Sequence, residues 1–91
     1  MRELVRWVLG VDRRVLVMKE ISRSDIVKPA KIAERYGRSV QNISRAIHEL
    51  EGQGLVECLT PSKKTWKRYI LTEKGKKVYQ ELMKSGLLGN E

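Results

Sequence analysis

Hydrogen-bonding side chains share one face of a segment that is expected to be a helix. From Ser39 onward, apolar residues recur at helical spacing at Val40, Ile43, Ile47 and Leu50, which predicts a helix over 39–52 whose stripe faces a core. At about 100° per residue, the opposite face carries polar side chains. Glutamine and asparagine can pair with adenine, and arginine with guanine O6 and N7. The side chains expected to contact bases in a DNA groove are Gln41, Asn42, Ser44, Arg45 and His48.

Most of the positive charge lies in one short segment. The 91 residues include 19 Lys and Arg against 11 Asp and Glu, a net charge of +8. Residues 60–77 hold seven of the basic residues and one acidic residue, which is +6 of that total. A compact basic patch attracts a polyanion and speeds its capture. The side chains expected to contact phosphates here are Lys63, Lys64, Lys67 and Arg68; the alternative is a solvated loop that only aids solubility.

The start of the polar-faced helix is a second place for an anion. Backbone N–H groups and the helix dipole favour negative charge at a helix N-terminus. Arg38 and Ser39 stand at that end and are expected to bind phosphate. Lys28 and Lys31, near the start of the preceding helix, are expected to add phosphate contacts.

Catalytic and metal chemistry is not indicated. The single histidine, His48, has no assignable partner for a triad, and one histidine cannot form a multi-histidine metal site. The single cysteine, Cys58, falls in an expected strand and is interpreted as a small core residue; redox sensing is the alternative, because the neighbouring charge is positive. No glycine-rich phosphate loop precedes a helix. We therefore expect no enzyme, no cofactor and no metal.

The length and composition point to one small intracellular domain. A chain of 91 residues is expected to form a single domain over 1–91. No apolar run approaches the roughly 20 residues of a membrane span, and the N-terminus lacks the apolar core of a signal peptide. We expect a cytoplasmic protein with no membrane contact.

The elements that must position these residues follow from periodicity and turn residues. Pro29 suits a first helical turn, Gly37 ends that helix, and Ser39 is a good N-cap for the next one. Two short helices joined by such a tight turn are the signature of a helix-turn-helix. The first expected element is a helical region over 3–21, with a break at Gly10 and Asp12 as the cap of its second part. A short strand over 26–28 and helices over 29–36 and 39–52 follow. Strands over 55–59 and 66–71 then enclose a basic loop, and a last helix is capped by Thr72.

Five pieces of the chain, in order, resemble a known pattern. They are residues 31–37, 39–45, 47–51, 54–56 and 71–75. Together they resemble the winged helix-turn-helix of prokaryotic transcriptional regulators, most closely the MarR-like and related small archaeal regulators, over about residues 25–80. The resemblance implies a mainly helical α+β fold, with a three-helix core, a β-hairpin wing, and added N- and C-terminal helices. It also implies a homodimeric regulator on double-stranded DNA, with helix 39–52 in the major groove and the wing, 60–68, on the backbone or in the minor groove.

The terminal helices are the candidates for self-association. The division expected is residues 1–24 for dimerisation, 25–72 for the helix-turn-helix and wing, and 73–91 for the C-terminal helix. An apolar stripe wider than one small core needs often marks an interface; the alternative is a monomer whose first helix is simply core. A small-molecule effector between these helices and the DNA-binding part is possible, but no residue indicates one. The expected interface residues are Leu4, Val8, Val11, Val15, Val78, Leu82 and Met83.

Two other binding functions compete with this interpretation. The same fold can serve as an adaptor that binds protein or RNA without recognising a DNA sequence. A winged helix that binds left-handed DNA is similar around Pro61 and Trp66, but Ser44 and His48 stand where that family has Asn and Tyr. Little affinity for duplex DNA at low salt would favour the adaptor.

The basic segment generates a first prediction. Lys64→Ala should weaken binding to every duplex alike, because a phosphate contact carries no sequence information. The dependence of log K on log salt should become shallower by about 0.9, the loss of one neutralised phosphate. Titrations of a selected and a random duplex at several salt concentrations measure both quantities. A loss confined to the selected duplex would contradict the assignment.

Overall fold

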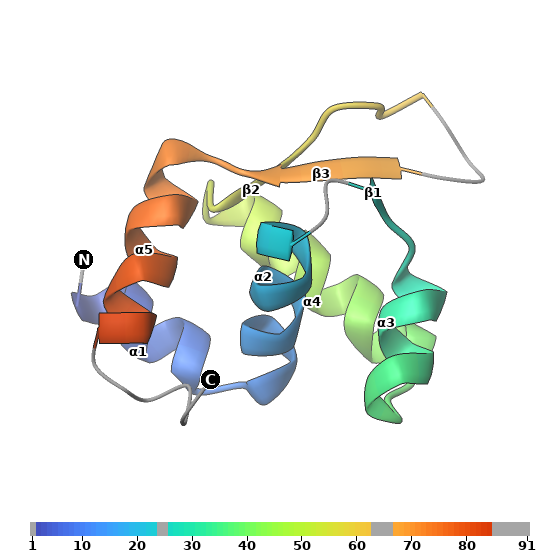
Figure 1. The fold of residues 1–91 in the computed structure, drawn as a ribbon, viewed down its shortest axis with the longest axis horizontal. Coiled ribbons are helices and arrows are strands. Elements are labelled where there is room, and N and C mark those ends of the chain that lie inside the picture. The colour runs from blue at the N-terminus through green and yellow to red at the C-terminus, as the bar shows by residue number, and fades with distance from the viewer. Residues whose placement is uncertain (1, 24–25, 63–66, 85–91) are drawn as a thin grey trace.

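The protein is mainly helical, with a small sheet at one end (Figure 1). The computed structural model describes residues 2–23, 26–62 and 67–84, with the side chains of Ile26 and Val27 left out. Lys63, Lys64 and Trp66 therefore lie outside the described residues. The helices and strands are α1 (Arg2–Leu9), α2 (Asp12–Arg23), β1 (Ile26–Val27), α3 (Pro29–Tyr36), α4 (Val40–Gly52), β2 (Val56–Cys58), β3 (Lys67–Leu71) and α5 (Glu73–Lys84). This is the predicted order of elements.

The first helical region is divided at Gly10, as expected. The Gly10 N–H donates to the carbonyl of Arg6, and α2 begins two residues later. Asp12 is the first residue of α2 and not the residue before it, so the predicted position of the cap is corrected by one. Its carboxylate still stands in the first turn, where the helix dipole favours negative charge.

The tight turn between α3 and α4 forms as the sequence predicts. Gly37 ends α3 in the left-handed conformation, with φ 65°, and its N–H donates to the carbonyl of Ala33. Ser39 caps α4, since its hydroxyl accepts from the Asn42 N–H at 3.1 Å. Both ends are thus fixed by local contacts, which sets the angle at which α4 leaves α3.

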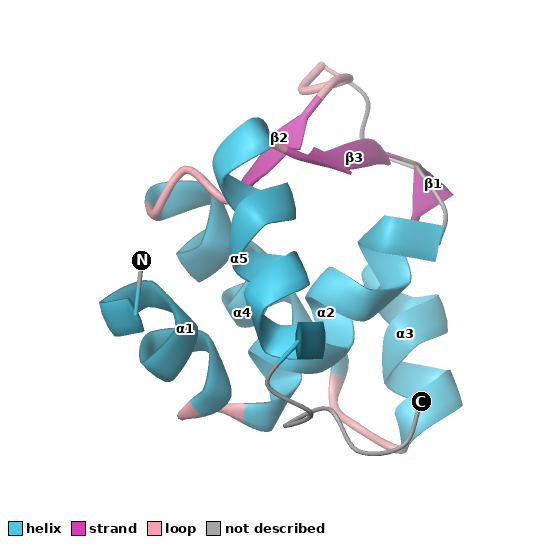
Figure 2. Cartoon of the chain, turned by 60° about the vertical axis from the view of Figure 1, so that its left-hand side comes forward, coloured by secondary structure: helices cyan, strands magenta, loops and turns pink. Residues whose placement is uncertain are grey.

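The strands form one antiparallel sheet with β3 in the middle, in the order β1-β3-β2 (Figure 2). Val56 pairs with Leu71 and Cys58 with Tyr69 in the predicted hairpin. The pairing of β1 with Lys67 and Arg68 was not predicted. The first strand of the hairpin is shorter than expected, covering 56–58 in place of 55–59, and the second covers 67–71, all the described residues of the predicted 66–71. The sheet joins the segment before α3 to the wing.

The core lies between α2, α4 and the inner face of the sheet. Its residues come from every helix and from β2 and β3, and the largest fully buried ones include Met18, Ile43, Ile47, Leu50 and Leu55. Val40, the first residue of the predicted core stripe, is a correction, because 47% of it is exposed. Helical side chains lean toward the N-terminus, so the side chain of the first residue extends past the end of the packed stripe.

The burial of the terminal helices corrects part of the expected dimer interface. Val8, Val78 and Leu82 are 0% exposed within a single chain. They belong to the core between α1 and α5 and are not accessible to a second chain. Leu4, Val11 and Val15 are half-buried, and Met83 is 51% exposed. Only these four residues of the predicted set are accessible.

The backbones of two distant segments meet at Gly75. A Cβ at this position would overlap the carbonyl oxygen of Leu55 and lie 2.9 Å from its carbonyl carbon. The same Leu55 carbonyl accepts from the Thr72 N–H at 3.1 Å. The Thr72 hydroxyl donates to the Gly54 carbonyl at 2.6 Å and accepts from the Gly75 N–H at 3.0 Å, which confirms it as the cap of α5. We call these contacts the 54–75 junction.

The junction predicts which glycine the fold requires. Gly75→Ala should lower the free energy of unfolding by about 1–3 kcal/mol, because backbone atoms must shift to admit the methyl group. Gly52→Ala is the matched control, since its Cβ would meet nothing within 4 Å and its φ is not positive. That control should be neutral or stabilising by about 0.5–1 kcal/mol. Urea denaturation measures both, and equal stability of the two variants would contradict the constraint.

Candidate nucleic-acid interface

The outer face of α4 is a shallow depression lined by polar side chains. Ile43, Ile47 and Leu50 anchor the opposite face in the core, so the outer side chains are held by a packed helix. Asn42, the fifth predicted base-contacting residue, is half-buried and does not line the depression. The lining consists of Val40, Gln41, Ser44, Arg45, His48 and Glu49. The structure thus brings four of the five predicted residues together and adds Val40 and Glu49.

The predicted phosphate site at the start of α4 already contains an ion pair. Arg38 donates through Nη2 to the Asp12 carboxylate. Ser39, beside it, is exposed and caps the helix with its hydroxyl. The Arg38 guanidinium therefore lies at the N-terminal end of α4, as predicted. The Asp12 carboxylate occupies the place where a phosphate is expected to bind.

Glu49 is held at the edge of the depression by Arg14. Arg14 Nε donates to Glu49 Oε1 at 3.0 Å, and its Nη1 donates to the Trp7 carbonyl at 2.6 Å. The guanidinium carbon also lies 3.7 Å from the centroid of the Trp7 ring. Such stacking suits a planar cation whose charge is partly desolvated. One side chain thus connects α1, α2 and α4 and pairs with the acidic residue of the depression.

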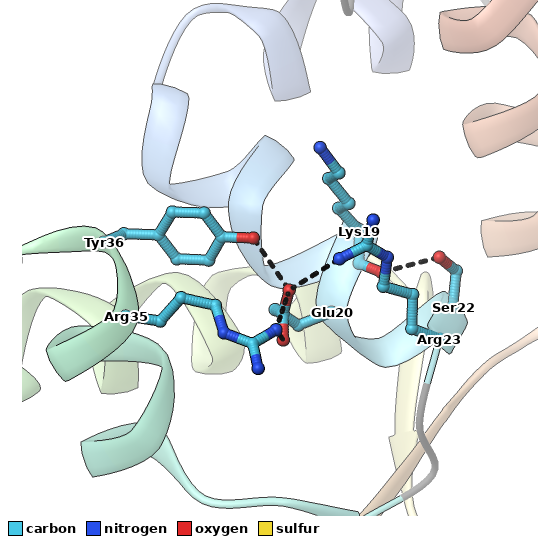
Figure 3. A network of polar contacts seen from close by, with 6 residues as sticks. All are labelled: Lys19, Glu20, Ser22, Arg23, Arg35 and Tyr36. Carbon is cyan, nitrogen blue, oxygen red and sulfur yellow. Dashed lines mark hydrogen bonds and ion pairs between the residues drawn. The ribbon is translucent and has the colours of Figure 1, made fainter. Parts of the chain in front are cut away.

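A second polar cluster joins α3 to α2 around Glu20 (Figure 3). The Glu20 carboxylate accepts from Arg35 Nη1 at 3.0 Å and from the Tyr36 hydroxyl at 2.7 Å. Arg23 Nη1 is 3.8 Å from the same carboxylate. Burial raises the pKa of Tyr36, and the hydrogen bond to Glu20 adds to the shift. The phenol of Tyr36 therefore stays protonated at neutral pH and donates its hydrogen bond to Glu20. Tyr36 and Arg35 together attach the last turn of α3 to α2.

The wing is described only at its base. Lys67 and Arg68 are half-buried on β3, and the Arg68 N–H donates to the Thr60 hydroxyl at 3.0 Å. Lys28 and Lys31 are exposed at the start of α3. β1 pairs with Lys67 and Arg68 at the base of the wing. Lys28, which follows β1 and precedes α3, therefore lies at the same end of the sheet as the base of the wing.

The hairpin also contains the cysteine. Cys58 is half-buried and packs against the core, which agrees with its interpretation as a small packing residue. It pairs with Tyr69, whose pKa is raised to about 12 by burial, with smaller contributions from Glu51 and Cys58. Tyr69 is therefore a neutral core residue at physiological pH.

Sequence reasoning missed the acidic partners of these cations. Asp12, Glu20 and Glu49 lie 26, 15 and 35 residues from Arg38, Arg35 and Arg14. No local pattern links such distant residues. The sequence shows only that each acidic residue lies on the polar side of a helix that is expected to pack against another helix. This pattern is too common to identify which arginine it pairs with.

Two other kinds of site find no support in the described part of the chain. None of its helices combines the length and the apolar character that crossing a membrane requires. Over the same residues, no three His, Cys, Asp or Glu side chains are grouped closely enough to hold a metal ion.

Comparison with solved structures shows the same arrangement of elements. The chain superimposes on the transcriptional regulator SlyA with a TM-score of 0.68 and 29% identity, over 86% of this chain and 55% of that one. A MarR/EmrR family transcriptional regulator from Acinetobacter gives a TM-score of 0.68 at 22% identity, over 82% and 54%. A mutant MarR from E. coli complexed with operator DNA gives 0.68 at 18% identity, over 92% and 64%.

These likenesses confirm the predicted winged helix-turn-helix fold. The chain spans about half the length of the first structures it matches, between 50% and 55%. No match is found among curated protein sequences. The MarR family model matches residues 12–60, which are 49 of the 91 residues and run from α2 through the hairpin's first strand. The chain therefore belongs to the MarR family.

Proposed function

We propose that this protein is a transcriptional regulator that binds a specific double-stranded DNA sequence as a cytoplasmic homodimer. The observation that carries the proposal is the outer face of α4, where the exposed side chains of Gln41, Arg45 and His48 and the half-buried Ser44 line one depression on a helix anchored by a buried stripe. Two of the similar structures, SlyA and the Acinetobacter protein, are described as transcriptional regulators, and the E. coli MarR was solved with operator DNA. The proposal includes no catalytic activity and no cofactor.

In this proposal α4 lies in the major groove and supplies the base contacts. Arg45 pairs with guanine, and Gln41 with adenine, because these side chains match the donor and acceptor pattern of those bases. Asn42, Ser44 and His48 complete the contact surface. Such bidentate pairs contribute about 1–3 kcal/mol of discrimination each, so they account for sequence preference.

The phosphate contacts come from the surrounding basic residues. They hold the protein on the duplex without selecting a sequence. Ser39 and Arg38 act at the N-terminus of α4, and the wing over residues 60–68 lies on the backbone or in the minor groove. The proposed set is Lys28, Lys31, Arg38, Ser39, Lys63, Lys64, Lys67 and Arg68.

The accessible apolar residues of the terminal helices form the proposed dimer contact. Leu4, Val11 and Val15 are half-buried and Met83 is exposed in one chain, so a second chain can cover them. Two-fold symmetry would set the recognition helices about 34 Å apart, one DNA turn, on a palindromic site. Sedimentation of the protein with and without DNA measures the stoichiometry.

The base contact predicts a specific loss in an Arg45 variant. A duplex is first selected from a random pool, which tests DNA binding and palindromy together. Arg45→Ala should weaken binding to the selected duplex by about 5- to 150-fold, the equivalent of 1–3 kcal/mol, and weaken binding to random DNA far less. Lys84→Ala, which removes the same charge from the last turn of α5, is the control. Equal losses on both duplexes would refute base recognition, and a pool without duplex binders would favour the protein or RNA adaptor.

The Asp12–Arg38 pair predicts a gain of affinity. Asp12→Asn removes the carboxylate that competes with phosphate for Arg38 and should strengthen binding to all duplexes by about 2- to 5-fold at low salt, the scale of a surface ion pair. The salt dependence should steepen by at most about 0.9. Glu3→Gln, the same charge change in the first turn of α1, is the control. Weaker binding by Asp12→Asn would show instead that the carboxylate positions Arg38.

A further inference from the structure

An apolar side chain interrupts the polar surface of the recognition helix. Val40, Leu59 and Met83 are the large hydrophobic residues that the described part of the chain leaves exposed. Met83 belongs to the proposed dimer contact, and Leu59 follows β2 in the hairpin. Val40 differs from both, because it is 47% exposed on the same depression as Gln41, Ser44 and Arg45. Its exposure is not explained by the core or by self-association.

The backbone at Val40 is held by the cap of α4. Val40 is the first residue of α4, directly after the Ser39 cap, whose hydroxyl accepts from the Asn42 N–H. A β-branched side chain has few χ1 rotamers, so a contact made by the two methyl groups of Val40 costs little side-chain entropy.

The major groove offers one apolar group on its base edges, the C5-methyl of thymine. The other groups there are hydrogen-bond donors and acceptors, which a valine cannot satisfy. In helix-turn-helix proteins the N-terminal residues of the recognition helix contact base edges, and Val40 occupies that end of α4. An exposed valine among polar neighbours thus matches a pyrimidine methyl group in both chemistry and position.

We propose that Val40 is a specificity-determining residue that packs against the C5-methyl of a pyrimidine in each half-site. The inference rests on the proposed function, because it requires α4 to lie in the major groove. The methyl group belongs to thymine or to 5-methylcytosine. The pyrimidine lies next to the bases contacted by Gln41 and Ser44, its neighbours in the depression.

The test replaces single methyl groups in the selected duplex. Each thymine is changed in turn to deoxyuridine, which alters only the C5 substituent. At one position per half-site, the wild-type protein should lose about fourfold in affinity, the value of one buried methyl group. Val40→Ala should bind the original duplex more weakly and should show no difference between thymine and deoxyuridine at that position. Leu59→Ala, the matched exposed apolar control, should keep the wild-type difference.

The outcomes distinguish the role of Val40 from the proposed DNA-binding function. A deoxyuridine penalty of the same size in wild type and Val40→Ala would overturn the role of Val40, and so would the absence of any penalty. In either case specific binding by the wild type would leave the proposed function standing. Failure to select any duplex would overturn both. Circular dichroism and thermal melting check that Val40→Ala is folded. The variant is expected to fold because the side chain of Val40 is largely outside the core.

A cytosine series identifies the source of the methyl group. At the same position, 5-methylcytosine and cytosine in a C·G pair are compared. Tighter binding to 5-methylcytosine, by about fourfold, would support recognition of the methyl group in either pyrimidine. Equal binding, together with the deoxyuridine penalty, would support recognition of thymine alone.

Discussion

The approach of the α5 backbone to Leu55 is the constraint on which the arrangement of the site depends. Leu55 donates its N–H to the Leu50 carbonyl at the end of α4 and accepts from Thr72 at the start of α5. The hairpin begins one residue after Leu55 and ends one residue before Thr72. Helix α4, the hairpin and α5 therefore share one backbone junction, and the absence of a side chain at Gly75 permits it. This junction therefore holds α4, which carries the proposed base contacts, in a fixed position relative to the hairpin, which carries proposed phosphate contacts.

Polar contacts also join α2 to both helices of the motif and to the turn between them. Asp12 holds Arg38 before α4, Glu20 holds the last turn of α3, and Arg14 holds Glu49. All three pairs involve α2, so this helix orients the two helices of the motif. The pairs are partly exposed, and each contributes modestly to stability. Their larger effect is electrostatic, because they decide which cations near α4 already have an anionic partner.

The parts of the fold that local chemistry determines could be predicted from the sequence. Gly37, Ser39 and Thr72 end or begin helices through contacts within a few residues, and their positions were correct. Features that depend on distant segments were missed. The pairing of β1 with β3 and the contact of Gly75 with Leu55 join residues far apart in the chain.

The candidate site divides in the same way. Four of its polar residues follow from helical periodicity alone and lie together in the structure. Val40 fits the same periodic stripe, yet it is exposed, because periodicity does not show where the packing partners of a helix end. The wing charge could be located in sequence, while its contacts beyond Lys67 and Arg68 lie outside the described residues.

The 54–75 junction also sets the direction of α5. Helix α5 continues for nine residues beyond Gly75, which at 1.5 Å per residue is about 14 Å. A change of about 10° in its direction at Gly75 would displace its far end by about 2.4 Å. In the proposed dimer, assembled through the terminal helices, the packing of one glycine would thus affect the distance between the two α4 helices.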